Sequence, residues 1–264
     1  MGRFSRLERG KTRDVVVKPE RKAEGKERPT TEAYDFPYYI ARADEQFFHG
    51  EYEKALRLYS RALQLDNSQK YPWVGQIFCL LEMNQLKEAD LWVARALQLF
   101  PEEPSLISLR AIIYAHKGMI RRAIGTSDYA LSKGSSMFAW IARGEVLLMA
   151  DNKNAHFCFE KAMEMAEFDD WKTPMRIGMV YFKRKAYSNA LTYLQKACAS
   201  NVRNSFLWYH MGLCYHKLGF EQKAMEALKL ALEHNPEFRP AERALEMVSR
   251  TPFYKRFWRF LTRK

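Results

Sequence analysis

Few residues of this sequence are spaced for metal chemistry. The nearest approach is a group of three, His210, Cys214 and His216, in which the first two are one helical turn apart. On a helix, His216 would point to a different face, so the three cannot converge on one ion. The sequence therefore predicts no metal site.

The remaining polar residues do not form a catalytic arrangement either. Two acid pairs, Glu102–Glu103 and Asp169–Asp170, fall in expected loops, where carboxylates are normally solvated. No glycine-rich loop is placed to hold a phosphate, and no nucleophile is spaced beside a base. We expect no enzymatic activity and no cofactor.

The charge of the chain is concentrated at its two ends. The formal net charge is +12, and residues 1–33 carry +4 of it while residues 251–264 carry +5. The composition of residues 1–33, rich in Lys, Arg, Glu, Pro and Gly, is typical of a disordered basic arm. The near-neutral body argues against a long nucleic-acid track, so nucleic acid is the less favoured partner.

The sequence also bears on location. No stretch reaches the roughly eighteen apolar residues that a membrane-spanning helix needs, and the charged N-terminus has no apolar core behind it. The four cysteines are scattered without paired spacing, which suits buried, reduced thiols. We expect a cytoplasmic protein, with contact to a membrane surface as an open alternative.

An internal repeat begins after Tyr34. Its clearest unit runs from Ser205 to Phe238, and positions 4, 8, 11, 20, 24, 27 and 32 of this unit hold Trp208, Gly212, Tyr215, Ala224, Leu228, Ala231 and Pro236. A second unit, Lys70–Glu103, has the same length of 34 residues. In this spacing of small and large residues the chain resembles the tetratricopeptide repeat superfamily.

The resemblance implies an all-α fold. We expect a right-handed superhelical solenoid of about six helix–turn–helix repeats over residues 34–250, with residues 239–250 as a helix that caps the last repeat. Glycines at position 15, Gly50, Gly118 and Gly219, mark the turns between paired helices. The fourth repeat fits only if its turn is one residue shorter.

The resemblance also implies a partner surface. In such repeats the first helices line a concave groove, here read as Phe47, Tyr71, Val74, Phe78, Ile112, Ile141, Met175, Met179, Phe182, Tyr209 and Leu213. This apolar, aromatic and partly Met-rich groove favours an apolar or amphipathic segment of a protein partner. The alternative is that neighbouring repeats or the chain's own ends cover these residues.

The segment 251–264 is the most distinctive feature outside the repeats. At 100° per residue its aromatic and basic side chains separate onto two faces, among them Phe253, Tyr254, Phe257 and Trp258 on one and Arg256 and Arg259 on the other. Such a segment binds an anionic membrane or a partner, or it caps the last repeat.

Three functions fit the sequence. The leading interpretation is a scaffold or adaptor for protein partners. The alternatives are a membrane-peripheral assembly factor that uses the basic ends and, least favoured, a nucleic-acid-associated factor. The oligomeric state cannot be read from the sequence.

Overall fold

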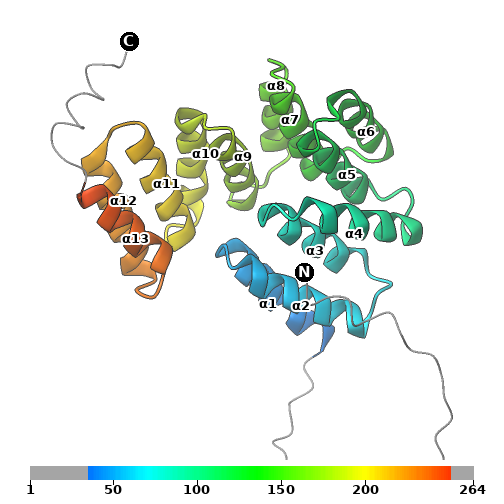
Figure 1. Cartoon of the computed structure of the whole chain (residues 1–264), viewed down its shortest axis with the longest axis horizontal. Coiled ribbons are helices and arrows are strands. Elements are labelled where there is room, and N and C mark those ends of the chain that lie inside the picture. The colour runs from blue at the N-terminus through cyan, green and yellow to red at the C-terminus, as the bar shows by residue number, and fades with distance from the viewer. Residues whose placement is uncertain (1–34, 251–264) are drawn as a thin grey trace, which may run out of the picture. The chain divides into compact units, whose positions relative to one another are not determined.

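The computed structural model describes residues 35–250, and these residues form helices joined by short turns (Figure 1). The chain divides into two units, Met1–Ala33 and Tyr34–Lys264, and all of the described residues belong to the second. The helices are α1 (Phe36–Phe48), α2 (Tyr52–Leu65), α3 (Lys70–Glu82), α4 (Leu86–Leu99), α5 (Pro104–His116), α6 (Ile120–Lys133), α7 (Met137–Met149), α8 (Ala155–Glu164), α9 (Lys172–Lys183), α10 (Tyr187–Ser200), α11 (Ser205–Lys217), α12 (Glu221–His234) and α13 (Arg239–Ser249).

The helices are arranged as six successive pairs followed by α13. Each odd-numbered helix packs against the even-numbered helix after it, and each even-numbered helix contacts the start of the next pair. The first helices begin at Phe36, Lys70, Pro104, Met137, Lys172 and Ser205, which confirms the predicted all-α solenoid of six repeats. The last helix, α13, packs on α12 and α11 and covers the end of the array.

Small side chains allow the paired helices to approach closely. The alanines at positions 20 and 27, and their counterparts in the fourth repeat, are fully or almost fully buried: Ala55, Ala62, Ala89, Ala96, Ala123, Ala130, Ala155, Ala162, Ala190, Ala197, Ala224 and Ala231. Position 8 of the first helix is Gly in the last three repeats. At Gly144 an added Cβ would lie 2.4 Å from the ring of buried Phe159, so only a glycine fits there without movement.

The turn inside each repeat requires a left-handed residue at position 15. Gly50, Gly118 and Gly219 have φ values of 79°, 77° and 78°, as expected for glycine at a helix C-terminus. In the other three repeats the same position is occupied by Asn84, Asp151 and Lys185, with φ values of 57°, 52° and 61°. The geometry of the repeat thus imposes the conformation even where the residue disfavours it.

Tryptophans and caps fix where the first helices begin. The indole N–H of Trp73 donates to the carbonyl of Asn67 at 3.0 Å, and that of Trp208 donates to the carbonyl of Val202 at 2.6 Å. The Asn204 side chain accepts hydrogen bonds from the backbone of α11, and the Ser136 hydroxyl accepts one from the backbone of α7. These contacts satisfy N–H groups that a helix leaves unpaired at its N-terminus.

The fourth repeat departs from the others in its second helix. The helices α2, α4, α6, α10 and α12 each have 14 residues, whereas α8 has 10. It begins at Ala155, two positions later in the repeat than its counterparts. Its buried residues Ala155, Phe159 and Ala162 nevertheless take the places of positions 20, 24 and 27 one residue early, as the sequence predicted. It ends at Glu164, two positions before the end of its counterparts, and residues 165–171 connect it to α9.

None of the helices within residues 35–250 is long and apolar enough to cross a membrane.

Candidate binding surfaces

The inner surface, formed by the first helices, holds the eleven predicted groove residues in three states of exposure. Tyr71 is exposed, whereas Val74, Phe78, Met179, Phe182, Tyr209 and Leu213 are half-buried. The remaining four, Phe47, Ile112, Ile141 and Met175, are buried at 7%, 3%, 4% and 4% exposure. In this arrangement those four side chains contact the rest of the chain and expose little surface to solvent.

The first two repeats also contact the fifth and sixth. The ring of Phe48 on α1 lies edge-on to Trp171, with centroids 5.1 Å apart, and Lys172 Nζ lies 4.9 Å from the centroid of the Phe48 ring. Phe206 lies against Gly50, where an added Cβ would meet its ring at 2.5 Å. An ion pair of 2.6 Å joins Lys183 on α9 to Glu82 on α3.

Charged and aromatic side chains of α1, α2, α3 and α9 form a cluster, in which Asp44 and Arg176 are the charged members. The carboxylate of Asp44 accepts hydrogen bonds from the hydroxyls of Tyr59 and Tyr71. The guanidinium of Arg176 lies 4.7 Å from the Phe78 ring and 5.5 Å from the Phe138 ring. A cavity of about 40 Å³ separates Asp44 from Arg176, which is room for about one water.

Sequence reasoning missed the part that Arg176 plays in this cluster. The one available signal was that Arg176 is the only charged residue between Lys172 and Lys183 in the otherwise apolar run of α9. Burial lowers the pKa of Arg176, although it remains a cation at neutral pH. Its cation–π contacts therefore help hold α9 against α3 and α7.

The inner face of α9 and α11 remains partly open. Phe182 lies edge-on to His210 at 5.1 Å, and Tyr209 lies edge-on to Phe238 at 5.4 Å. His210 is buried, and its Nδ1 is 2.9 Å from the carbonyl oxygen of Phe206. Burial lowers the pKa of His210 to about 4; the bond to Phe206 opposes this shift and Lys183 adds to it. At neutral pH an uncharged His210 imidazole therefore packs against the half-buried rings of Phe182 and Tyr209.

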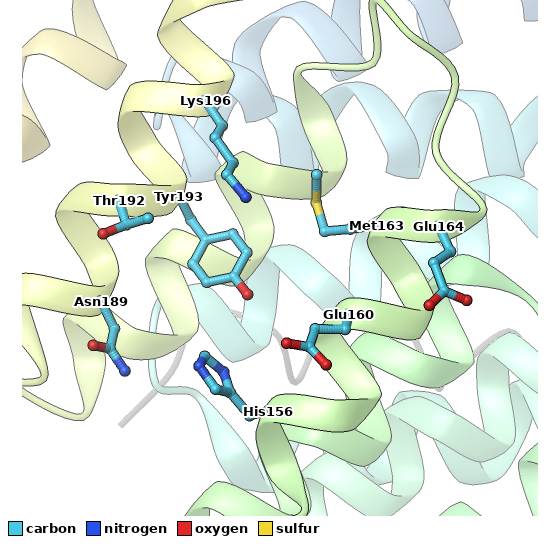
Figure 2. A pocket seen from close by; sticks show the side chains of 8 residues that line it. All are labelled: His156, Glu160, Met163, Glu164, Asn189, Thr192, Tyr193 and Lys196. Atoms are coloured by element: carbon cyan, nitrogen blue, oxygen red, sulfur yellow. The ribbon is translucent and has the colours of Figure 1, made fainter.

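A second cavity, larger than the one beside Asp44, is on a different surface, between α8 and α10. It measures about 610 Å³ and is lined by His156, Glu160, Met163 and Glu164 of α8 and by Asn189, Thr192, Tyr193 and Lys196 of α10. Figure 2 shows the His156 ring, the Glu160 carboxylate and the Tyr193 ring turned toward one shared space. Because α8 has 10 residues and the other second helices have 14, α8 covers less of the neighbouring surface of α10.

The polar groups of this cavity are positioned by the helices around it. The Tyr181 hydroxyl and His156 Nδ1 form a hydrogen bond of 2.7 Å, and Tyr193 stacks on Tyr181 with centroids 5.7 Å apart. Burial, followed by Tyr193, raises the pKa of Tyr181 to about 12. The Thr192 hydroxyl donates to the carbonyl of Ser188. The lining therefore offers binding groups rather than an activated nucleophile.

Residues beside the cavity are both acidic and apolar. From Ala155 to Asp170 the chain has five carboxylates, Glu160, Glu164, Glu167, Asp169 and Asp170, against one lysine, Lys161. Phe157, Met165 and Phe168 are exposed in the same stretch, at 52%, 44% and 105%. This combination was not predicted, although the run "MEMAEFDDW" already carries both signals.

The cysteines do not supply chemistry. All four are free and buried, and burial raises the pKa of each thiol. The thiols therefore stay protonated at neutral pH, in which form they are poor nucleophiles. Within residues 35–250 no three His, Cys, Asp or Glu side chains are grouped to hold a metal ion. The predicted tail residues, Phe253, Tyr254, Arg256, Phe257, Trp258 and Arg259, lie outside the described residues.

Two protein families match the chain. The family described as "Tetratricopeptide repeat" matches residues 49–124, and the family described as "Anaphase-promoting complex, cyclosome, subunit 3" matches residues 148–231. Among curated proteins, none matches this sequence. The matched ranges together cover parts of all six repeats, including the irregular fourth.

Solved structures with a similar fold include three tetratricopeptide-type or related assemblies. YrrB, described as a TPR protein with an unusual peptide-binding site, is 21% identical over 71% of this chain and 97% of its own, with a TM-score of 0.42. A chain of the APC/C hetero-tetramer Cut9–Hcn1 is 16% identical over 81% of this chain and 43% of its own, with a TM-score of 0.49. The human IFIT1 dimer with m7Gppp-AAAA is 13% identical over 87% and 68%, with a TM-score of 0.51, a likeness of fold alone.

Proposed function

Because this chain belongs to the tetratricopeptide repeat superfamily, we propose that it is a non-enzymatic scaffold that holds an apolar or amphipathic segment of a protein partner on its inner face. Tetratricopeptide repeats generally mediate contacts between proteins, through the extended surfaces that stacked repeats create. The finer proposal concerns which part of the surface receives the partner.

The partner segment lies along α9 and α11. The observation that carries this proposal is a group of four half-buried apolar side chains on these two helices, Met179, Phe182, Tyr209 and Leu213. Each is supported from behind by the core of the solenoid, yet each keeps surface exposed to solvent. A rigid, partly exposed apolar group of this kind gains free energy when a partner covers it.

The contacts between the first two repeats and the fifth limit the space in front of the α9–α11 face. The contacts of Phe48 with Trp171 and of Glu82 with Lys183 hold the first two repeats against the fifth. Since they fix the first repeats beside the α9–α11 face, they limit how bulky a segment can enter. An extended chain or one helix is therefore the expected form of the ligand.

The test is affinity capture with the full chain, followed by mass spectrometry. Met179→Glu together with Leu213→Glu places charge on the proposed contact surface without opening a large cavity. Leu91→Glu together with Leu99→Glu is the matched control, because these leucines are 72% and 53% exposed on α4. We expect the first pair to lose captured partners at least tenfold and the control pair to keep them. Equal loss, or no loss, would reject the α9–α11 face.

A further inference from the structure

The surface between α8 and α10 combines a cavity, a group of carboxylates and exposed apolar side chains. Its cavity of about 610 Å³ exists where α8 is four residues shorter than the other second helices. Two glutamates and one lysine, Glu160, Glu164 and Lys196, line it. The stretch 155–170 carries five carboxylates against one lysine in a protein of net charge +12, and exposed aromatic and Met side chains lie in the same stretch. An opening of this composition fits a segment that is basic and aromatic.

Several carboxylates of this surface are available for such a segment. Glu164 pairs with Lys161 at 2.6 Å, and Asp170 accepts hydrogen bonds from the backbone N–H groups of Lys172 and Thr173. For Glu160, Glu167 and Asp169, by contrast, no ion pair with another residue of the range 35–250 is present. Glu160 faces the cavity beside Tyr193, as Figure 2 shows.

We propose that the α8–α10 surface is the docking site of the chain's own residues 251–264. This segment has five Lys or Arg residues and no acid, interleaved with Phe253, Phe257 and Trp258. Its basic side chains pair with the carboxylates around the cavity, and its rings cover Met163 and the exposed Phe157 and Phe168. Charge and apolar character are complementary on both sides.

The segment is long enough to reach this surface within one molecule. It follows α13, which is separated from α10 by α12 and α11. Three helix-packing steps of about 8–10 Å add up to roughly 30 Å, whereas fourteen extended residues span about 46–50 Å. Docking in the same chain is therefore geometrically possible without unfolding α13.

Zero-length carbodiimide cross-linking of the full chain tests the contact directly. The reagent joins a lysine amine to a carboxylate only where the two touch, so Lys255 or Lys264 should couple to Glu160, Glu164, Glu167 or Asp169. We expect these cross-links in the monomer and a fall of at least fivefold in 0.5 M NaCl, because salt screens the attraction. A mixture of isotope-labelled and unlabelled chains shows whether a cross-link joins one molecule or two.

A pair of charge reversals supplies the matched comparison. Glu160→Lys with Glu164→Lys should reduce the cross-links to Glu167 and Asp169 at least fivefold. Glu53→Lys with Glu88→Lys makes the same change of charge on α2 and α4 and should leave them unchanged. A thermal unfolding curve for each variant confirms that the solenoid is intact.

Trypsin cleavage at Lys255, Arg256 and Arg259 gives a second readout on the same proteins. Docking should slow the first cut, and the α8 charge reversal should accelerate it severalfold. The proposal is overturned if the tail cross-links to Glu53 and Glu88 as readily, if all cross-links join two molecules, or if both variants are cleaved at the wild-type rate. It is also overturned if the tail is protected only when phosphatidylserine vesicles are added, since a membrane is then the binding surface.

Discussion

Gly144 offers a sharp test of how the repeats pack. An alanine Cβ at this position would lie 2.4, 2.7 and 2.8 Å from three ring carbons of Phe159, and that ring is fully buried. Because ordinary contacts of this kind exceed 3.4 Å, α7 and α8 must separate by close to an ångström. Overpacking of this kind lowers the unfolding free energy by about 1–3 kcal/mol. The higher helix propensity of Ala relative to Gly offsets about 0.5–1 kcal/mol of this loss. We expect Gly144→Ala to lose about 1–2 kcal/mol of unfolding free energy.

Gly125 is the matched control, because it also lies inside a helix but has no atom within 4 Å of an added Cβ. Gly125→Ala should gain about 0.5–1 kcal/mol from helix propensity alone. Urea unfolding of the two variants should therefore differ by roughly 2–3 kcal/mol. Adding Phe159→Leu to Gly144→Ala should show a favourable coupling of at least about 1 kcal/mol in a double-mutant cycle. Equal changes in the two glycine variants, or no coupling with residue 159, would refute the packing described for the fourth repeat.

Three further predictions follow from single positions. Lys185→Gly removes a left-handed lysine with φ of 61° and should raise the unfolding free energy by about 0.5–1 kcal/mol in urea titrations; a destabilised variant would contradict this. Because the pKa of His210 is lowered to about 4, the unfolded chain binds a proton at this residue between about pH 6.5 and 4 while the folded chain does not. The unfolding free energy should therefore fall by up to about 3 kcal/mol as the pH is lowered through that window. His210→Asn should remove this part of the fall, as urea unfolding at a series of pH values would show. Trp171→Ala removes the ring that packs on Phe48 and should speed amide hydrogen exchange in α1 more than in α5; uniform exchange in the two helices would argue against a joint between the first and fifth repeats.

Sequence reasoning reached the regular part of the fold because that part depends on local spacing. Ala224, Ala231 and Gly212 lie where two helices touch. A small residue at each of these positions is therefore enough to predict the helix contact from the sequence. The position-15 turn was predicted from three glycines, while Asn84, Asp151 and Lys185 adopt the same conformation without a glycine to mark it. For these residues the flanking helices determine the backbone.

The contacts between distant repeats could not be predicted in the same way. Phe48 meets Trp171 and Glu82 meets Lys183 because small rotations between neighbouring repeats accumulate along the solenoid. No spacing within one repeat determines the sum of these rotations, so contacts of this kind could not be read from the sequence. The cavity between α8 and α10 was missed for a related reason. The irregular fourth repeat was recognised, but the loss of two residues at each end of α8 became clear only from the helix bounds Ala155 and Glu164.

The most direct test of the central claim is a binding selection with a random peptide display library against the full chain. If the α9–α11 face receives a partner segment, the enriched peptides should carry apolar residues at alternating or helical spacing. Their affinity should fall at least tenfold for Met179→Glu with Leu213→Glu and stay within twofold for Leu91→Glu with Leu99→Glu. Peptides that bind all three proteins equally well would contradict the claim, because the inner face would then not be the binding surface.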